Sequence, residues 1–144
     1  MTTVITNRTY LKPVPQCTPE NQPFWDAMAE HRFLVPRCQD CGTYGWVPYP
    51  ACRECLSENL EWTQVSGEAT VYSFTIVHRG PGAFNEDAPY AIVAAALAED
   101  PVRLVLLANT TGIPNEDLKI GMPVRIAYED LPNEDITLWR VGPA

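Results

Sequence analysis

The second half of the chain alternates apolar and polar residues with the period of two that is typical of half-buried β-strands. A strand candidate over 60–65 precedes five further segments of this kind, over 69–79, 90–98, 102–109, 124–128 and 136–141. The segment 90–98 is almost entirely apolar, which indicates a central strand. A Gly- and Pro-marked connection over 111–120 separates the third of these five from the fourth. Five short antiparallel strands with a long connection after the third predict a mainly β fold, a Greek-key barrel of the OB type.

The N-terminal part of the chain follows a different pattern. Residues 1–22 are polar and interrupted by prolines, so we expect an extended arm that lies on this domain or on a partner. A short helix is predicted over 24–31, because Pro23 suits a first turn and apolar side chains recur at a spacing of three or four. We interpret His31 as a packed or surface histidine rather than a ligand. The residues of the predicted apolar face are Phe24, Ala27, Met28 and His31.

Four of the five cysteines form two C-x-x-C pairs, Cys38/Cys41 and Cys52/Cys55. A C-x-x-C turn presents two thiolates close enough to share one metal ion, and two such turns complete a tetrahedron. Gly42, directly after the first pair, suits a turn that needs a positive φ. We therefore predict a Zn²⁺ site that is structural rather than catalytic, because four thiolates leave no open coordination position.

Three other interpretations of the paired cysteines stay open. They are a redox dithiol, a pair of disulfides, and iron in a rubredoxin-like electron carrier, which uses the same ligand set. Cys17 lies in a Pro-rich stretch without a nearby ligand and is expected to be a free thiol.

The cellular compartment bears on the choice between metal ligation and disulfides. No basic region followed by an apolar block is seen at the N-terminus, and no segment approaches the ~18 apolar residues of a membrane span. We therefore expect a cytoplasmic protein that does not enter a membrane. Thiols stay reduced in that compartment, which favours metal ligation over disulfides.

Charge and motif content narrow the function classes. Ten Lys and Arg against 18 Asp and Glu give a formal net charge of −8, which argues against binding to a phosphate backbone. Proline accounts for 14 of 144 residues, about twice its usual share of ~5%, which disfavours long helices. No nucleophile elbow, His-Glu-x-x-His motif or phosphate-binding glycine loop is present, so no catalytic residues are assigned.

The ordered set of motifs resembles the rubredoxin-like zinc-ribbon plus OB-fold family of acyl-CoA-associated proteins. The corresponding division of the chain is an N-terminal arm and helix over 1–31, a zinc ribbon over 32–62 and an OB fold over 63–144. The family often has Pro-Pro-Arg between the two knuckles, whereas this chain has Pro48-Tyr49-Pro50 and lacks the arginine. The shared pieces are Phe24-Trp25, Arg37-Cys38-x-x-Cys41-Gly42, Cys52-x-x-Cys55, Val71-Tyr72-Ser73-Phe74-Thr75, His78-Arg79, Pro89-Tyr90 and Ile120-Gly121-Met122-Pro123.

The resemblance implies a non-catalytic accessory subunit of a thiolase-superfamily enzyme. The partner is expected to be a β-ketoacyl-CoA thiolase or a lipid-transfer-protein-like aldolase of steroid side-chain breakdown, and to hold the catalytic residues. This chain then stabilises the partner and shapes its acyl-CoA channel. By analogy with dimeric thiolases, a 2:2 heterotetramer is expected. The acyl group and the choice between thiolysis and retro-aldol cleavage are left open.

One loop carries the candidate acyl-CoA or partner contacts. Residues 78–89 join the first two barrel strands, a connection that OB folds often use for ligands. Arg79 suits a CoA phosphate, because a guanidinium binds phosphate in bidentate fashion. Phe84 suits a pocket, and His78 and Tyr90 complete the candidate set. The alternative is a solvated hairpin loop with Phe84 packed onto the core of its own domain.

Two other functions stay open at this point. The first is a single-stranded nucleic-acid-binding zinc-ribbon/OB protein, because OB barrels bind single strands through a basic groove with stacking aromatic residues. The aromatic residues are present here, but the basic residues are few and scattered. The second is an independent enzyme or iron carrier, since a catalytic triad need not be local in sequence.

Overall fold

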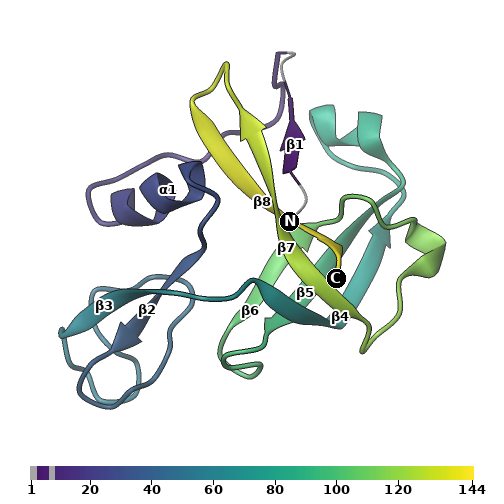
Figure 1. The fold of residues 1–144 in the computed structure, drawn as a ribbon. Coiled ribbons are helices and arrows are strands. Elements are labelled where there is room, and N and C mark those ends of the chain that lie inside the picture. Colours follow the sequence, from purple (N-terminus) through teal and green to yellow (C-terminus); the bar gives the residue numbers. More distant parts are fainter. Residues whose placement is uncertain (1–2, 7–8) are drawn as a thin grey trace.

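The computed structural model describes residues 3–6 and 9–144, and most of the second half of the chain forms one sheet (Figure 1). Its five principal strands pair in the order β6-β5-β4-β7-β8, and all of these pairs are antiparallel. The prediction of a mainly β fold with five OB-type strands is confirmed. The strands are β4 (Glu68–Val77), β5 (Tyr90–Leu97), β6 (Val105–Asn109), β7 (Pro123–Leu131) and β8 (Ile136–Pro143).

The two edges of this sheet approach each other without a continuous ladder. Thr110, after β6, and Val141 in β8 share one isolated parallel bridge, and the backbone N–H of Thr111 donates to the carbonyl of Val141 at 2.9 Å. The indole N–H of Trp139 donates to the carbonyl of Leu107 at 3.0 Å. The strand order is therefore that of an OB fold, but strand pairing does not close the barrel.

Strand β5 lies between β4 and β6, as its apolar sequence predicts. Val93, Ala95 and Leu97 point into the core and are fully buried. Leu104 and Leu106 face them from the next hairpin and are also fully buried. Apolar side chains that are removed from water stabilise a fold in proportion to the area buried. The buried residues of this hairpin therefore stabilise the barrel.

Strand β4 departs from a strict period of two. Its ladder with β5 shifts register between Val71 and Ser73, which places Tyr72 in a β-bulge. Val71 is 1% exposed and Tyr72 is 67% exposed, whereas Phe74 is half-buried against the core. A bulge adds one residue to a strand and redirects the side chains that follow it. Tyr72 therefore does not share a face with Phe74.

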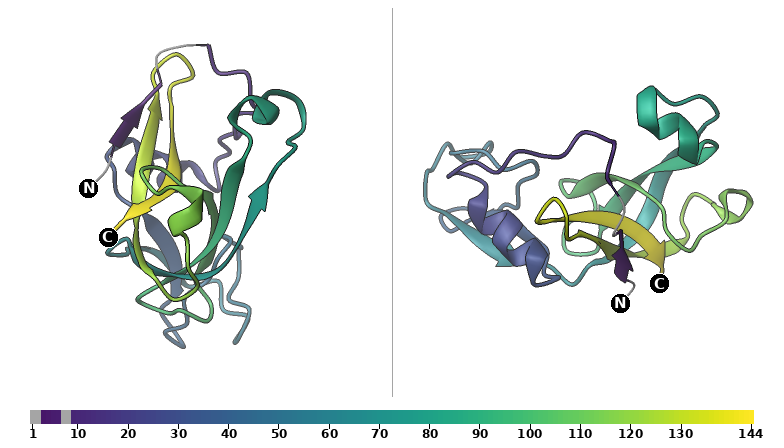
Figure 2. Two further views of the ribbon diagram at one scale, coloured as in Figure 1. Left: turned by 90° about the vertical axis from the view of Figure 1, so that its right-hand side faces the viewer. Right: turned by 90° about the horizontal axis from the view of Figure 1, so that it is seen from above.

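The N-terminal arm lies on this domain. Strand β1 (Thr3–Ile5) pairs in parallel with β7, so that Val4 lies opposite Glu129. The backbone N–H of Thr6 continues this edge by donating to the carbonyl of Asp130 at 2.9 Å. Figure 2 shows the arm passing from this strand towards the helix. A strand of three residues is too short to show a period, which is why the sequence predicts only an extended segment here.

Helix α1 (Gln22–Ala29) precedes a two-stranded antiparallel ribbon formed by β2 (Leu34–Cys38) and β3 (Leu60–Gln64). The helix carries a proline in its first turn, as predicted. It ends two residues before His31, whose φ is 57°, so the predicted extension of the helix to His31 is wrong. The helical residues of the predicted apolar face, Phe24, Ala27 and Met28, are all buried. In the part of the chain that the structure describes, no helix is long and apolar enough to cross a membrane.

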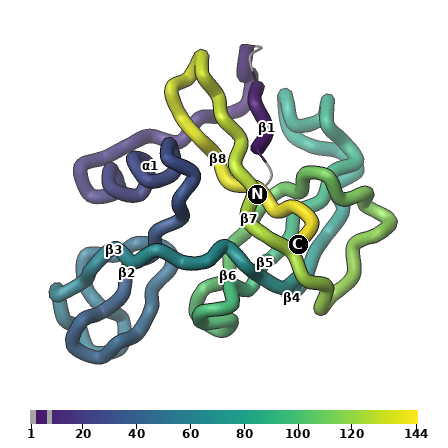
Figure 3. The backbone as a smooth tube through the Cα atoms, viewed as in Figure 1, coloured from purple at the N-terminus to yellow at the C-terminus, as the bar shows by residue number. Residues whose placement is uncertain are grey.

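A group of aromatic residues, here called the aromatic junction, joins the ribbon to the barrel. Phe24 of α1 lies at its centre, with ring-centroid distances of 5.2 Å to Phe33, 5.6 Å to Trp46 and 5.7 Å to Trp139. Trp46 comes from the loop between the cysteine pairs, and Trp139 comes from β8. Figure 3 shows the chain leaving the ribbon through β3 and passing directly into β4. The members of the junction are Phe24, Trp25, Phe33, Trp46, Trp62 and Trp139.

His31 adds a polar link between the helical segment and the barrel. Its Nε2 lies 2.9 and 3.0 Å from the carboxylate oxygens of Asp130, and its ring stacks on Tyr128 at 4.9 Å. The hydroxyl of Thr137 donates to the same carboxylate at 2.7 Å. Burial raises the pKa of Asp130, but the hydrogen bonds from His31 and Thr137 outweigh burial and lower that pKa below its ordinary value of 3.8. His31 is thus a packed histidine, as interpreted from the sequence.

Removal of the central ring of the aromatic junction should destabilise the whole chain. We expect Phe24→Ala to lower the free energy of unfolding by about 3–5 kcal/mol, the usual cost of deleting a buried phenyl ring. Urea unfolding followed by tryptophan fluorescence measures this change. Asp26→Ala on the exposed side of the same helix is the matched control and should change stability by less than about 0.5 kcal/mol. Equal effects of the two variants would contradict the central role of Phe24.

The lowered pKa of Asp130 predicts a contribution to stability that acid removes. A carboxyl whose pKa is lower in the folded chain contributes fully above about pH 5, and the contribution is lost as the pH falls through 3.8 and below. Between about pH 6 and about pH 3, the free energy of unfolding should fall more steeply for the native chain than for Asp130→Asn. Parallel curves for the two proteins would show that the carboxylate makes no such contribution.

Candidate functional site

The four paired cysteines converge at the end of the ribbon. Their Sγ atoms all lie within 4.8 Å of one another. The Sγ atoms of Cys38 and Cys55 are 3.6 Å apart, and those of Cys41 and Cys52 are also 3.6 Å apart. Cys38 and Cys52 are buried, whereas Cys41 and Cys55 are exposed, so one side of the cluster faces solvent. Cys17 is exposed and lies outside the cluster.

Each cysteine pair sits on a turn with the same backbone geometry. The N–H of Gly42 donates to the carbonyl of Cys38, and the N–H of Leu56 donates to the carbonyl of Cys52, both at 2.9 Å. Gly42 has φ 77° and Leu56 has φ 65°. The first turn has the glycine that a positive φ favours, as predicted, whereas the second places an exposed leucine in that conformation. Metal ligation by Cys52 and Cys55 would hold this turn in place and so account for the unfavourable positive φ of Leu56.

A polar link that sequence reasoning missed connects the two turns. The carboxylate of Asp40, in the first turn, accepts hydrogen bonds from the hydroxyl of Ser57 and, at 3.3 Å, from the side-chain amide of Asn59. These two hydrogen bonds lower the pKa of the Asp40 carboxyl. Ser57 and Asn59 follow Asp40 in the sequence by 17 and 19 positions. The three residues belong to no known ligand pattern, so only the fold brings them together.

The sulfur positions fit one metal ion and do not fit disulfides. Zn–S bonds of about 2.3 Å place the sulfurs of a tetrahedral site about 3.8 Å apart. A disulfide would join its two sulfurs at about 2.05 Å, and all four cysteines are free in the structure. The geometry therefore supports a metal ion held by four thiolates, a ligand set that zinc and iron share.

The thiols of the cluster perturb one another strongly. Hydrogen bonds with the side chain and the backbone of Thr43 lower the pKa of Cys41 to about 6. At Cys55, the backbone N–H of Ser57 lowers the pKa, but the neighbouring sulfurs, led by Cys38, raise it to about 12. Four thiols this close cannot all ionise side by side unless a cation balances their charge. A divalent metal ion provides that balance and would hold all four as thiolates.

The candidate acyl-CoA residues fall into two groups. His78 and Arg79 follow the end of β4 and are exposed. The chain then forms the 3₁₀ helix η1 (Gly82–Asp87), in which Phe84 packs against Tyr90 with ring centroids 6.2 Å apart. The structure thus brings Phe84 and Tyr90 together and leaves His78 and Arg79 at the surface.

The residues of this loop set its shape. The N–H of Gly80 donates to the side-chain oxygen of Asn85 at 3.1 Å. A Cβ at Gly80 would lie 3.0 Å from both Phe84 and Tyr90, so this close approach requires glycine. The side-chain amide of Asn115 donates to the carbonyl of Pro89 at 3.0 Å and fixes the far end of the loop.

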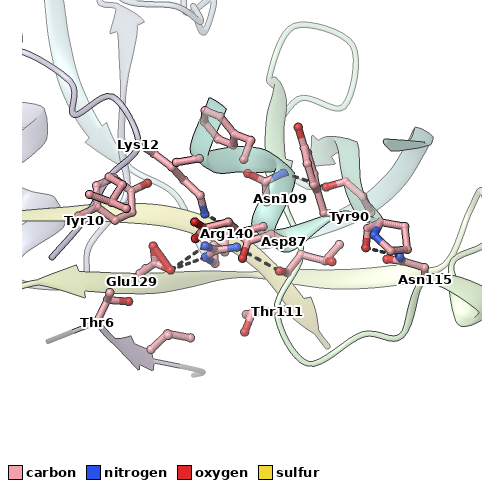
Figure 4. A pocket seen from close by; sticks show the side chains of 18 of the residues that line it. Thr6, Tyr10, Lys12, Asp87, Tyr90, Asn109, Thr111, Asn115, Glu129 and Arg140 are labelled. Atoms are coloured by element: carbon pink, nitrogen blue, oxygen red, sulfur yellow. Dashed lines mark hydrogen bonds and ion pairs between the residues drawn. The ribbon is translucent and has the colours of Figure 1, made fainter. Parts of the chain in front are cut away.

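Phe84 and Tyr90 line a polar cavity of about 450 Å³, here called the arm cavity, between the N-terminal arm, η1 and strands β7 and β8 (Figure 4). Neither His78 nor Arg79 lines it. An ion pair between Lys12 of the arm and the η1 loop spans its rim. Sequence reasoning missed this cavity because its walls come from segments that are distant in the chain and share no local motif.

Two family models match the chain and together span residues 25–129. Residues 25–61 match the rubredoxin-like zinc ribbon domain of ChsH2. Residues 62–129 match the C-terminal OB-fold domain of ChsH2. The first match contains all four paired cysteines.

Curated relatives fall into two groups by length. The chain is 33% identical over 113 residues to a DUF35 domain-containing scaffold protein of Pyrococcus furiosus, covering 78% of this chain and 80% of that protein. It is 32% identical over 134 residues to a probable enoyl-CoA hydratase alpha subunit of Thermomonospora curvata, covering 93% of this chain and 40% of that subunit. It is 33% identical over 116 residues to the 3-oxo-4,17-pregnadiene-20-carboxyl-CoA hydratase alpha subunit of Mycobacterium tuberculosis, covering 81% of this chain and 36% of that subunit. The chain therefore spans about 40% or less of the length of these hydratase subunits.

A solved structure shares the complete architecture. The chain superposes on a chain of the Ltp2-ChsH2(DUF35) aldolase with a TM-score of 0.78 and 28% sequence identity. The superposition covers 90% of this chain and 98% of that chain. The arrangement of helix, ribbon and barrel is thus a shared fold.

Replacement of the buried ligand of the second pair should remove the metal and unfold the ribbon. We expect the native chain to carry one equivalent of zinc by elemental analysis and Cys52→Ser to carry only a small fraction of it. Metal binding is coupled to folding by about 10–16 kcal/mol in zinc peptides, so the near-UV circular dichroism of the ribbon tryptophans should collapse with the metal. Cys17→Ser is the matched control and should retain both the metal and the spectrum.

The visible absorption spectrum of the purified native chain distinguishes bound zinc from bound iron. A zinc protein is colourless, whereas iron on four thiolates absorbs visible light. Full metal content and a native spectrum in Cys52→Ser would contradict a four-cysteine metal site.

Proposed function

The chain belongs to the DUF35 family of proteins that combine a ChsH2-type zinc ribbon with an OB-fold domain, and from this premise we propose that it is a non-catalytic accessory subunit of an enzyme that acts on acyl-CoA thioesters. The observation that carries the proposal is the match to 98% of a chain from an aldolase whose name joins two components, Ltp2 and ChsH2(DUF35). Relatives named as alpha subunits and as scaffold proteins support the same role.

The engagement of the histidines supports a non-catalytic role. His31 is committed to the carboxylate of Asp130 and to the ring of Tyr128. His78 is exposed. Over residues 3–6 and 9–144, neither histidine is hydrogen-bonded to a serine or a cysteine that would serve as a nucleophile. The catalytic groups of the assembly therefore belong to the partner.

The metal in this proposal is a structural Zn²⁺ held by the paired cysteines. Four thiolates complete its coordination, so it offers no position to a substrate or to water. Its role is to fix the two turns of the ribbon and, through Trp46 in the loop between them, the aromatic junction. The ligands are Cys38, Cys41, Cys52 and Cys55.

The loop after β4 is the proposed site of contact with acyl-CoA at the boundary with the partner. Arg79 is exposed, and within the described residues no carboxylate pairs with it, so its guanidinium is available to a CoA phosphate. His78 lies beside it in the chain. Phe84 and Tyr90 give the same loop an aromatic base. These four residues would form this chain's share of the acyl-CoA channel.

The reaction of the partner is proposed from the neighbours' names. A lipid-transfer-protein-like aldolase of the thiolase superfamily is the first candidate, because the structural neighbour is named an aldolase. A hydratase is the second candidate, favoured by two relatives whose names include that activity. A 2:2 heterotetramer is the proposed assembly.

The distribution of basic groups disfavours the nucleic-acid alternative. Arg103, Arg125 and Arg140 each lie within 4.0 Å of a glutamate oxygen. Arg37 and Arg53 lie over tyrosine rings, at 4.7 and 3.8 Å from their centroids. A single-strand groove needs unpaired cations along a path for the phosphates, and these cations are already engaged.

Co-expression with a thiolase-like subunit tests the proposed role. We expect an affinity-tagged copy of this chain to co-purify with the larger subunit at a ratio of 1:1, and the larger subunit to lose activity or solubility when the chain is omitted. A chain that stays monomeric beside every acyl-CoA aldolase or hydratase subunit from its own genome would contradict the proposal.

Arg79 offers a sharper test within the assembled complex. Loss of one charge-assisted phosphate contact in Arg79→Ala should raise the KM for acyl-CoA about tenfold, the equivalent of about 1.4 kcal/mol, with kcat unchanged. Lys119→Ala, which removes an exposed cation from the β6–β7 connection, is the matched control and should leave KM unchanged. Equal increases in KM would mean that net charge, and not a contact of Arg79, attracts the substrate.

A further inference from the structure

The floor of the arm cavity contains a buried carboxylate with one unused oxygen. The side chain of Glu129 is 4% exposed. Its Oε2 accepts hydrogen bonds from both Nε and Nη2 of Arg140 at 2.7 Å, while a second terminal nitrogen of Arg140 donates to the carbonyl of Thr110 at 3.3 Å. Its Oε1 is buried and has no hydrogen-bond donor. A buried acceptor without a donor costs free energy, which a donor from outside the chain would recover.

The charges around the cavity define which donor suits it. Of the described charged residues that line it, Lys12 and Arg140 are positive, whereas Glu86, Asp87 and Glu129 are negative. Among these described residues one negative charge is in excess, and the two cations are already paired with carboxylates. An anion such as phosphate is disfavoured here, and a cation that donates a hydrogen bond is favoured.

Tyr10 reports the same electrostatic environment. Its side chain lines the cavity, and burial is the main reason that its pKa lies above the ordinary value. The negative charges of Glu129 and Asp87 raise the pKa further, because they oppose ionisation of the phenol, and Arg140 only partly offsets them. The carboxylates of Glu129 and Asp87 thus act electrostatically on the Tyr10 side of the cavity.

The aromatic wall already accommodates an ammonium group. The Nζ of Lys12 lies 5.8 Å from the centroid of the Tyr10 ring and 5.4 Å from that of the Phe84 ring. Rings at this distance attract a cation through their electron-rich faces. Figure 4 shows Tyr10, Lys12, Glu129 and Arg140 gathered along one wall. A second ammonium entering the cavity would meet aromatic rings at its rim and a free carboxylate oxygen at its floor.

We propose that the arm cavity is a binding site for a small organic cation, in which a primary ammonium donates a hydrogen bond to Oε1 of Glu129. A volume of about 450 Å³ accommodates an alkyl diamine and falls within the range of small-molecule sites. The site selects against phosphate and is therefore separate from the proposed CoA contact at Arg79. It does not rest on the proposed accessory role.

Titration of the full chain, uniformly labelled with ¹⁵N and loaded with zinc, tests the site. The probe is putrescine, with 1,4-butanediol as its neutral counterpart of the same length and inorganic phosphate as the anionic probe. Putrescine should produce saturable amide shifts at Thr6, Tyr10 and Glu129, and neither counterpart should do so. Absence of shifts at these amides, or equal shifts with the diol or with phosphate, would overturn the proposal.

Two variants separate this site from general attraction of a diamine to an acidic protein. Glu129→Gln should weaken putrescine binding at least tenfold, but it also leaves Arg140 without its charged partner. Ala83→Trp fills the cavity from η1 without altering charge and should abolish the shifts. Ala98→Trp, at an exposed alanine outside the cavity, is the matched control and should bind like the native chain. Unchanged binding by Ala83→Trp would place the diamine elsewhere and refute the site.

Discussion

Four cysteine sulfurs lie in one cluster at the end of the ribbon, and four thiolates this close repel one another unless a cation balances their charge. The sulfurs lie within 4.8 Å of one another. At Cys55 the neighbouring sulfurs outweigh the backbone hydrogen bond of Ser57 and raise the pKa to about 12, whereas hydrogen bonds with Thr43 lower the pKa of Cys41 to about 6. A divalent cation removes this repulsion and turns two exposed knuckles into a fixed end of the ribbon. Phe33 and Val35 are the main buried apolar side chains of the ribbon outside the cysteines, so its own core gives it little other support.

The aromatic junction connects the cysteine end of the ribbon to the barrel through direct ring contacts. Trp46 belongs to the loop between the cysteine pairs, yet its ring lies 5.4 Å from Phe33 and 5.8 Å from Trp139. A metal ion at the four cysteines would therefore fix a loop that packs on the barrel, and His31 links the same side of the molecule to the barrel through Asp130. On the barrel, the loop after β4 and the cavity beneath the arm that pairs with β7 are the proposed ligand sites. This division of tasks fits a subunit that contributes shape to an assembly rather than chemistry.

Much of the fold could be predicted because its signals are local. The C-x-x-C spacing, the apolar run of β5 and the proline at the start of α1 each act over a few residues. In the structure the four paired sulfurs converge, β5 lies between two other strands, and the proline lies in the first turn of α1. The details that local patterns do not predict depend on contacts between distant segments. Tyr72 is turned outward by a bulge set against β5, and His31 leaves the helix to reach Asp130. The arm cavity could not be predicted for the same reason. The Glu129–Arg140 pair at its floor becomes part of a cavity only because the distant N-terminal arm covers it.

We propose that this chain assists a catalyst and does not itself catalyse. The most direct test is the steady-state turnover of an acyl-CoA substrate by the co-purifying enzyme subunit, measured while zinc-loaded chain is added up to one equivalent. The account predicts no turnover by the chain alone and a value of kcat/KM for the partner that rises and saturates at equal stoichiometry. Turnover by the isolated chain, or a partner whose rate is indifferent to its addition, would contradict it.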